Sequence, residues 1–426
     1  MIIHVVRSGE SIYSIANSYG VRASDIIINN GINNPDRIIP GQSLVILIPQ
    51  IEYIIKPGDT LNSIAEQFNI TPLNILQNNP QIIGMPYIIA GNRLVIKYND
   101  EKRRNIRLNG FAYPNINRGI LQKALTYLTY LTIFAYGFDS EGNLTTINDQ
   151  PLINLSYLYK VAPVMMIATI SPDGGFNGDN ASIIFNDTAL QNKLINNILN
   201  VMLEKGYLGV DVDFEYLNPE DKDKYVAFLK RLTEKMHENN FFVMADLAPK
   251  TSANQQGFIY EGHDYKGIAE SVDDVMVMTY EWGYTYGPPM AVAPLNKVRD
   301  VIEYALTEMS ADKLMMGMPN YGYDWKLPFV SGESVARAIG NEAAVNIAIN
   351  NNVNIQFDNT AMSPYFNYTA DGIKHEVWFE DARSVNAKYE LIIEKNLQGA
   401  GYWNLMTPFA QNYAVVNSLF NITKIV

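Results

Sequence analysis

From residue 106 onward, short apolar stretches rich in β-branched and aromatic residues alternate with amphipathic, helix-like stretches. This pattern predicts eight strands, at 106–113, 130–135, 163–169, 207–214, 241–247, 274–280, 313–319 and 400–405. Apolar side chains recur at helical spacing over 225–236, and 382–397 also reads as a helix. Strands that alternate with helices predict an α/β fold, here a (β/α)8 TIM barrel, although a doubly wound sheet shows the same alternation.

The gap between the seventh and eighth predicted strands is far longer than the other gaps. Residues 326–377 hold a helix-like piece at 333–350, a strand-like piece at 353–357 and a Pro-Tyr-Phe turn at 364–366. We expect a small insert before the last strand, placed where it walls one side of a cleft at the barrel mouth.

The N-terminal part of the chain contains an internal repeat. Residues 4–12 (HVVRSGESI) align with residues 53–61 (YIIKPGDTL), and the match continues to a shared Gly-x-x-Leu at 41–44 and 91–94. Each copy reads as a short strand, a glycine turn, two helices, a loop and a second short strand. The repeat therefore predicts two small βααβ modules.

These patterns divide the chain into three parts and a linker. We place the modules at 1–49 and 50–98, a polar, charged linker at 99–105, and the barrel at 106–426, with 326–377 as its insert.

Composition narrows the possible partners. The chain has 44 acidic and 32 basic residues and a net charge of −12, which disfavours nucleic acid and anionic membrane surfaces as partners. With no cysteine, disulfides, thiol nucleophiles and cysteine-based zinc sites are excluded. No apolar run approaches the ~20 residues of a membrane span. We expect a monomer with no cofactor, no metal and no membrane insertion.

Three carboxylates occupy alternate positions in the fourth predicted strand. In 207–215 (YLGVDVDFE), Asp211, Asp213 and Glu215 share one face, because alternate side chains of a strand point the same way. Carboxylates clustered in an apolar barrel repel one another and lose hydration, which raises the pKa of at least one of them. A carboxylic acid still protonated near neutral pH can act as a general acid. The alternatives are an exposed or salt-bridged strand end and a divalent metal held by the three, which lack a nearby histidine.

Four motifs in barrel order resemble those of the family 18 glycoside hydrolases, the chitinase-like barrels. They are 209–215 (GVDVDFE) for the D-x-x-D-x-D-x-E signature, 278–281 (MTYE) for M-x-Y-D, 318–322 (MPNYG) at the end of strand seven, and 401–404 (GYWN) for the strand-eight Trp. The resemblance spans about residues 106–420 and implies a glycosidase.

The resemblance also implies roles for individual residues. Glu215 would be the general acid/base, Asp213 would hold the 2-acetamido group of the substrate, and Asp211 would tune the charge of Asp213. Tyr280 would bond the acetamido oxygen, and Trp403 would form the floor under the −1 sugar. The mechanism implied is substrate-assisted, with the acetamido oxygen as nucleophile, an exception to the scheme of two protein carboxylates. Further substrate-binding candidates are Glu281, Tyr321, Asn320 and Trp282, with Tyr284 as a weaker one.

Two positions depart from the family pattern. Leu208 stands at the first Asp of the signature, so the series of carboxylates is one member short. Glu281 replaces the Asp that follows the strand-six Tyr. Neither departure removes the acid, so we expect activity with an altered pH dependence.

The N-terminal repeats resemble LysM modules, which bind N-acetylglucosamine-containing glycans such as peptidoglycan and chitin. The residues of this resemblance include Ser11 and Thr60, whose hydroxyls stand where N-caps would satisfy free N–H groups. The candidate glycan contacts are Gly9, Ser11, Gly58, Asp59, Thr60 and Asn79. The alternative is a pair of structural modules with no ligand.

Two LysM units ahead of such a barrel resemble the spore cortex-fragment-lytic N-acetylglucosaminidases of spore-forming bacteria. This resemblance implies a hydrolase that cleaves after N-acetylglucosamine in peptidoglycan and acts in the spore coat or cortex during germination. The N-terminal residues show no signal peptide, which fits deposition from the mother cell. The alternatives are a chitinase acting on chitin oligomers and a non-catalytic glycan-binding or spore-coat protein.

Overall fold

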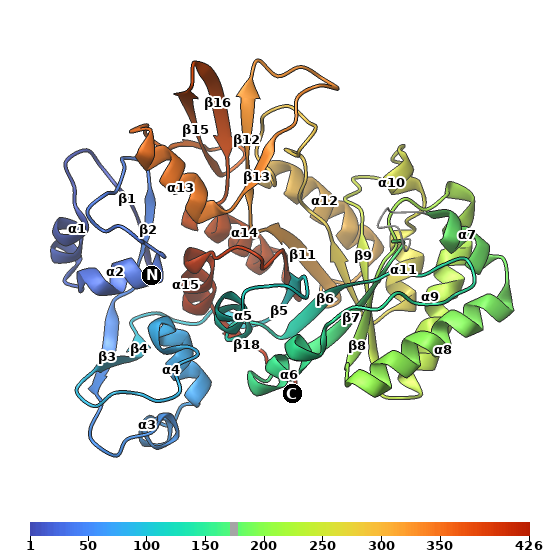
Figure 1. Ribbon diagram of the computed structural model, residues 1–426, viewed down its shortest axis with the longest axis horizontal. Coiled ribbons are helices and arrows are strands. Elements are labelled where there is room, and N and C mark those ends of the chain that lie inside the picture. Colours follow the sequence, from blue (N-terminus) through green and yellow to red (C-terminus); the bar gives the residue numbers. More distant parts are fainter. Residues whose placement is uncertain (171–177) are drawn as a thin grey trace.

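The computed structural model describes residues 1–170 and 178–426 (Figure 1). Eight parallel strands close into a barrel, because the last strand pairs with the first as well as with its neighbour. In chain order they are β5 (Arg104–Ala112), β6 (Tyr130–Tyr136), β7 (Ala162–Ala168), β8 (Gly209–Asp213), β9 (Phe242–Leu247), β10 (Asp274–Val277), β11 (Leu314–Pro319) and β17 (Gly399–Trp403). The predicted (β/α)8 barrel is confirmed, and closure excludes the doubly wound alternative.

Helices cover the outside of the barrel (Figure 1). They are α5 (Arg118–Leu125), α6 (Gln150–Leu158), α7 (Gly178–Phe185), α8 (Thr188–Lys205), α9 (Lys222–His237), α10 (Phe258–Glu261), α11 (Tyr265–Ser271), α12 (Leu295–Glu308), α14 (Ala382–Glu394) and α15 (Ala410–Leu419), with the short η2 (Pro219–Asp221). The helix predicted at 225–236 is part of α9, and its apolar face is fully buried. Among the described residues, no helix has both the length and the apolar character needed to cross a membrane.

The helix predicted at 382–397 ends earlier, at Glu394. Asn396 takes a left-handed conformation with φ 53°, and the Leu397 N–H turns back to the Ile392 carbonyl at 3.0 Å. A left-handed residue near a helix C-terminus is a common way to stop the helix.

An apolar layer fills the inside of the barrel. Met166, Met244, Met276 and Met315 come from four different strands and pack there with Phe111. Any carboxylate on the inner face of these strands therefore lies in a poorly hydrated environment.

The insert between β11 and β17 is larger than predicted. It forms a five-stranded sheet in the order β13-β12-β16-β15-β14, above the barrel in Figure 1. Its elements are β12 (Gly322–Leu327), β13 (Arg337–Ile339), α13 (Asn341–Asn350), β14 (Gln356–Asp358), β15 (Ser363–Ala370) and β16 (Ile373–Trp378).

Three details of the predicted insert were wrong. The helix begins at Asn341 rather than 333, because 337–339 pairs with β12 as a strand. The strand expected at 353–357 lies at 356–358, and the expected turn at 364–366 is part of β15. Pro364 has no backbone N–H to donate, but it lies at the start of β15, where a proline is tolerated, and its carbonyl accepts from the Phe379 N–H at 3.2 Å.

Both N-terminal modules have the predicted βααβ order. The first consists of β1 (Ile2–Val5), α1 (Ile12–Tyr19), α2 (Ala23–Asn29) and β2 (Ser43–Ile46); the second of β3 (Pro49–Ile54), α3 (Leu61–Phe68), α4 (Pro72–Asn78), η1 (Pro80–Ile82) and β4 (Arg93–Tyr98). In each module the two strands pair antiparallel. The predicted N-caps are present, since the hydroxyls of Ser11 and Thr60 each accept from the backbone N–H three residues later.

The segment expected to be a linker is partly in the barrel. Strand β5 begins at Arg104, and the short strand β18 (Phe420–Ile422) pairs in parallel with its first residues. The Arg103 N–H donates to the Leu419 carbonyl at 2.7 Å. The connection between the modules and the barrel is therefore anchored to the barrel from Arg103 onward.

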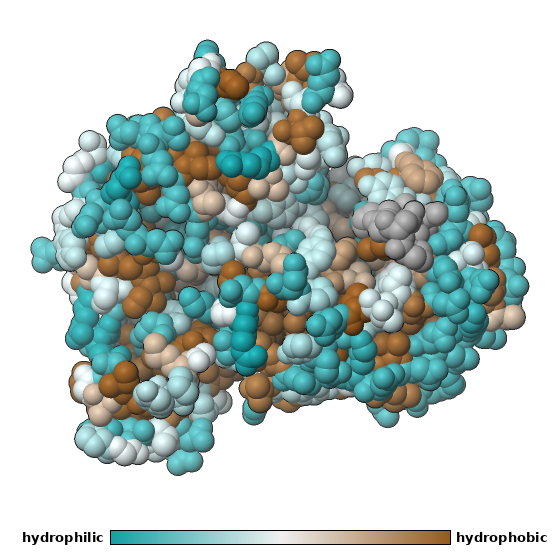
Figure 2. Space-filling view, in the orientation of Figure 1, coloured by the Kyte–Doolittle hydropathy of each residue, from teal (hydrophilic) through white to brown (hydrophobic). Residues whose placement is uncertain are grey.

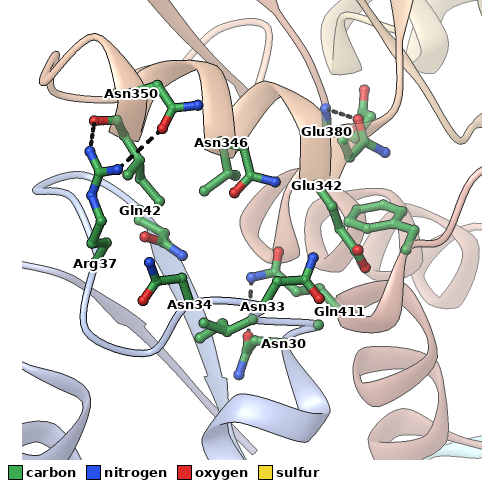
Figure 3. Close-up of a pocket in the computed structure, with 16 residues that line it drawn as sticks. Asn30, Asn33, Asn34, Arg37, Gln42, Glu342, Asn346, Asn350, Glu380 and Gln411 are labelled. Carbon is green, nitrogen blue, oxygen red and sulfur yellow. Dashed lines mark hydrogen bonds between the residues drawn. The ribbon is translucent and has the colours of Figure 1, made fainter.

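The first module is bound tightly to the barrel side of the molecule. Its residues face α13 and the start of α15 across a pocket (Figure 3). The volume of this pocket is about 90 Å³. The Gln411 side chain donates to the Ser43 carbonyl at 2.7 Å and to Asn30 Oδ1 at 3.1 Å. A Cβ added to Gly41 would lie 1.8 Å from the Ile355 carbonyl oxygen, so only glycine fits this contact.

The second module is bound through its α4. The Gln77 side chain donates to the Thr126 carbonyl at 3.1 Å, and the Tyr127 hydroxyl donates to the Gln77 carbonyl at 2.8 Å. Val95 and Tyr98 of this module belong to the same apolar core as the barrel helices. We call these two contact regions together the module seam.

Substitution of Gln411 by alanine should destabilise the molecule through the module seam. Gln411→Ala leaves the buried Ser43 carbonyl and the Ala382 N–H, which donates to Gln411 Oε1 at 2.9 Å, without these partners. We expect the free energy of unfolding in urea to fall by about 1–3 kcal/mol. The control is Gln150→Ala, an exposed amide on α6, for which we expect a change within about 0.5 kcal/mol. Equal losses in the two variants would contradict the seam as a source of stability.

Candidate active site

Strand β8 carries two of the three predicted carboxylates into the barrel. Asp211 and Asp213 are almost fully buried. Val210 and Val212, which alternate with them, lie in the apolar core between the barrel and its helices. Glu215 follows two residues after the strand ends and is partly exposed. The alternation predicted from the sequence is thus present as far as Asp213, and Glu215 continues it at the barrel mouth.

Asp211 lies deepest of the three. Its Oδ2 accepts from the Thr132 hydroxyl at 3.3 Å, and its Oδ1 has no hydrogen-bond partner among the described residues. Burial raises the pKa of Asp211 to about 7. This carboxyl can therefore carry a proton near neutral pH.

Asp213 and Glu215 form the upper part of the cluster. Burial, followed by the charges of Glu215 and Asp211, raises the pKa of Asp213 well above its ordinary value. Burial, followed by the charge of Glu281, raises the pKa of Glu215 to about 7. A glutamic acid with this pKa is protonated in a large fraction of molecules at neutral pH, as general acid catalysis requires.

The residues after β10 form a second acidic position. Glu281 adopts φ 67° and accepts hydrogen bonds from the hydroxyls of Tyr321 and Tyr323, the latter at 3.1 Å. Burial raises the pKa of Glu281, although these two hydroxyls oppose the shift. A left-handed conformation in a residue other than glycine is uncommon and concentrates at functional sites. Sequence analysis named Glu281 and Tyr321 but missed Tyr323, which only the pairing of the insert sheet places here.

Tyr280 is buried beside the carboxylates. It is 8% exposed, and a Cβ on Gly317 of the neighbouring strand would come within 2.8 Å of its ring. Burial and the surrounding carboxylates raise the pKa of Tyr280 well above its ordinary value, so the hydroxyl remains a neutral donor.

Trp403 ends β17, on the side of the barrel opposite β8. Its ring contacts Phe134 and Phe111, with centroid distances of 5.2 and 5.8 Å, and one part of it remains exposed. An aromatic surface at this position suits the apolar face of a sugar.

The remaining substrate-binding candidates differ in exposure. Asn320 is 5% exposed, and its amide donates to the carbonyls of Asn404 and Thr407, so it holds the loop after β17. Trp282 packs against the core, and Tyr284 is exposed and pairs with Tyr286.

Asp246 on β9 was missed by the sequence analysis. It is 2% exposed, its Oδ1 has no partner among the described residues, and the β8–β9 register places it beside Asp213. Burial, followed by the charges of the three carboxylates at 211–215, raises the pKa of Asp246 well above its ordinary value. The signal was a single Asp on the inner face of the apolar stretch 241–247.

The glycan-contact candidates in the modules serve local structure. Gly9 and Gly58 turn with positive φ, Ser11 and Thr60 cap helices, and Asp59 accepts from the Lys56 N–H at 2.7 Å. The Asn79 side chain is 1% exposed and bonds Ile75 and Val95 of its own module. The hydrogen bonds of Asn79 are thus used inside the module, which leaves the two turns as the accessible part of this set.

Comparison with known proteins identifies the family of each part. Residues 93–407 match the glycosyl hydrolases family 18, and residues 4–47 and 53–97 each match the LysM domain. The cortical fragment-lytic enzyme of Bacillus subtilis (strain 168) is 42% identical over 433 residues, covering 100% of this chain and 99% of that protein. The cortical fragment-lytic enzyme of Bacillus cereus is 36% identical over 430 residues, covering 99% of each.

Solved structures agree in fold. The spore cortex-lytic enzyme SleL of Bacillus megaterium QM B1551 superposes with a TM-score of 0.84 at 37% identity, covering 100% of this chain and 99% of that one. A chitinase from Chromobacterium violaceum covers 74% of this chain with a TM-score of 0.68 at 22% identity, a likeness of fold alone. The chain belongs to the glycosyl hydrolases of family 18 and is a glycosidase that carries two LysM domains.

Proposed function

We propose that this glycosidase cleaves peptidoglycan after N-acetylglucosamine, with fragments of the spore cortex as its substrate. The observation that carries the proposal is the series Asp211, Asp213 and Glu215 at the C-terminal end of β8, where barrel enzymes keep their chemistry. Full-length relatives named for lysis of cortex or its fragments support the choice of substrate. The same relatives support our proposal that the enzyme acts in the spore coat or cortex.

In this proposal the substrate supplies its own nucleophile. Glu215 donates its proton to the glycosidic oxygen while the acetamido oxygen of the −1 sugar attacks the anomeric carbon and displaces the leaving sugar. Asp213 accepts from the acetamido N–H and stabilises the positive charge that develops on that nitrogen. Tyr280 donates to the acetamido oxygen, and Trp403 supports the apolar face of the ring. Water then opens the cyclic intermediate, and the Glu215 carboxylate takes up its proton.

The position of the carboxylates favours this route over a protein nucleophile. Asp211, Asp213 and Glu215 come from one strand, so they approach the sugar from one side of the barrel. A retaining enzyme with a protein nucleophile needs a second carboxylate across the bond, about 5 Å from the acid. Asp246 adjoins Asp213 on the next strand and therefore belongs to the same side.

The LysM domains are proposed to attach the enzyme to its substrate. They bind the N-acetylglucosamine-containing strand and keep the barrel at an insoluble substrate, which raises the local concentration of cleavable bonds. A chitinase acting on chitin oligomers is the alternative, since the family 18 barrel and the LysM domains suit both glycans.

Substitution of Glu215 should abolish turnover. Glu215→Gln keeps the shape of the side chain, but its amide is not an acid and cannot transfer a proton to the glycosidic oxygen. We therefore expect the rate of fragment release from muramic-lactam-containing cortex glycan to fall by about 10²–10⁴-fold. Mass spectrometry of the released fragments measures both the rate and the sugar at the new reducing end. Glu238→Gln, an exposed carboxyl after α9, serves as control and should keep the wild-type rate. A rate in Glu215→Gln above about a tenth of wild type would show that another group is the acid.

The stereochemistry of the products tests the nucleophile. Proton NMR of early products should show the anomeric configuration of the substrate retained. Asp213→Asn should lose much of its rate, because a neutral amide cannot stabilise the positive charge on the acetamido nitrogen. Inverted products, or a glycosyl ester trapped on any protein carboxylate, would contradict substrate assistance.

The dependence of the rate on pH tests the charge around Glu215. Because the acid must be protonated and its pKa is about 7, kcat/KM should fall as the pH rises through about 7. Glu281→Gln removes a negative charge that raises the pKa of Glu215, so the alkaline limb of the profile should move to lower pH. Glu238→Gln should leave the profile in place. An alkaline limb that does not move in Glu281→Gln would show that the charge of Glu281 does not reach the acid.

A further inference from the structure

The inner face of strand β9 carries one carboxyl group in an otherwise apolar layer. Val212 of β8 pairs with Ala245 of β9. The next residues along the two strands, Asp213 and Asp246, are therefore lateral neighbours on the inner face. Parallel strands run about 4.8 Å apart, so two side chains at such positions reach each other. On its other side Asp246 pairs with Met276 of β10, which belongs to the apolar layer.

Asp213 and Asp246 have unused hydrogen-bonding capacity. The Oδ1 atom of each is buried and has no partner among the described residues. Two ionised carboxylates can only accept hydrogen bonds, whereas a protonated carboxyl also donates one. A proton on one of the two therefore allows a hydrogen bond between them, which a rotation of the side chains completes.

The surroundings of Asp246 favour its neutral form. The side chain is 2% exposed. The charges that act on it come from Asp211, Asp213 and Glu215 and are all negative. Burial, followed by these three charges, raises the pKa of Asp246 well above its ordinary value. Asp246 therefore keeps its proton when its neighbours ionise.

Two tyrosines also lie close enough for the charge of Asp246 to act on them. Tyr280 follows β10, and Tyr225 lies on α9, whose apolar face packs against β9. Burial raises the pKa of both hydroxyls well above the ordinary value, and the charge of Asp246 is among the further causes. Both hydroxyls are neutral near neutral pH, so neither provides a positive charge that would ionise Asp246.

The carboxylates on β8 differ in the donors that they have. The Thr132 hydroxyl donates to Asp211 at 3.3 Å, whereas Asp213 Oδ1 has no donor among the described residues. Leu208, at the first Asp of the family signature, packs against the methionine layer and has no polar group to offer. Asp246 is level with Asp213 and can supply what Leu208 cannot.

Asp246 does not face the open side of the site. In Figure 2 a notch separates the insert from the lobe of α7 and α10, so a glycan has room to approach the barrel between them. Glu215 is partly exposed, whereas Asp246 is almost completely buried. Asp246 is therefore placed to act on a substrate through Asp213 and not by contact.

We propose that Asp246 is a positioning residue that stays protonated during the reaction and donates a hydrogen bond to the Asp213 carboxylate. The inference rests on the proposed function, because Asp213 must be ionised to stabilise the positive charge on the acetamido group. A hydrogen bond to the ionised form favours that form, so Asp246 keeps Asp213 charged where burial alone would neutralise it. Asp246 exchanges no proton with the substrate.

Two substitutions separate a hydrogen-bond donor from an ionised neighbour. On the acid side kcat/KM rises as Asp213 ionises, so the acid limb of the pH profile reports this step. Asp246→Leu has no donor, and its acid limb should move to higher pH by about one pH unit. Asp246→Asn keeps an N–H donor in a side chain of similar shape, so its acid limb should stay within about 0.3 pH unit of wild type. The profiles are measured on the full-length protein with soluble glycan fragments from spore cortex.

Met244→Leu is the matched control, because Met244 lies two residues earlier on the same inner face and is 0% exposed. Its acid limb should stay in place and its rate within about twofold of wild type, since the exchange nearly conserves volume. Asp246→Val, a smaller apolar side chain, should shift the limb in the same direction as Asp246→Leu and replaces that variant if it does not fold.

Three results would overturn the inference. Acid limbs that move to lower pH in Asp246→Asn and Asp246→Leu would show that Asp246 is ionised and repels Asp213. An equal shift to higher pH in both variants would show that a hydrogen bond is not what Asp246 supplies. Limbs that stay in place in both, or that shift as far in Met244→Leu, would leave Asp246 a packing role only. If Asp213→Asn keeps the wild-type rate on the same fragments, the proposed role of Asp213 is wrong, a result distinct from the failure of Asp246.

Discussion

The central constraint on this molecule is that several carboxyl groups share a poorly hydrated barrel interior. Asp211, Asp213 and Asp246 are each at most 4% exposed, and each has one oxygen with no hydrogen-bond partner among the described residues. Taking a carboxylate out of water without compensation costs several kcal/mol, so the cluster as a whole keeps protons that separate, exposed carboxyls would lose. The raised pKa values of this cluster are the direct result. The raised pKa values therefore result from the fold, which buries several carboxyl groups together, and not from one side chain.

The closed barrel holds the carboxyl groups in this arrangement. Parallel pairing on both sides of β8 fixes which side chains point inward, and the methionine layer keeps them from relaxing toward water. A shift of one residue in register would exchange the carboxylates for Val210 and Val212 and would place charges among the helices. The family relationship fits this picture, because each of the four motifs reaches the C-terminal end of a barrel strand.

Much of this could be predicted from the sequence because the signals are local. The eight strands and the inward face of Asp211 and Asp213 follow from alternation along one strand, and the N-caps of Ser11 and Thr60 from spacing along one helix. Asp246 was missed because only the pairing of β9 with β8 brings it next to the other carboxylates.

Contacts between distant segments were also beyond local signals. The charged segment 99–105 was predicted to be a linker, because its own residues give no sign that β18 pairs with the start of β5. The insert helix was placed too early because residues 337–339 form a strand only in the presence of β12. The roles assigned to the site residues and the domain limits remain predictions.

The module seam limits which bonds of a peptidoglycan wall the barrel can reach while a module is bound to the glycan. Tethered binding domains search the volume that their linker allows, and their benefit falls as the linker lengthens. Here Gly41 against Ile355, and Gln411 against Ser43, leave no such freedom. A glycan bound by the first module therefore approaches the barrel from one direction. That direction is set by the fixed position of the module on the barrel and not by an average over linker conformations. Strand orientation in the wall, and not only sugar content, then decides which bonds come within reach.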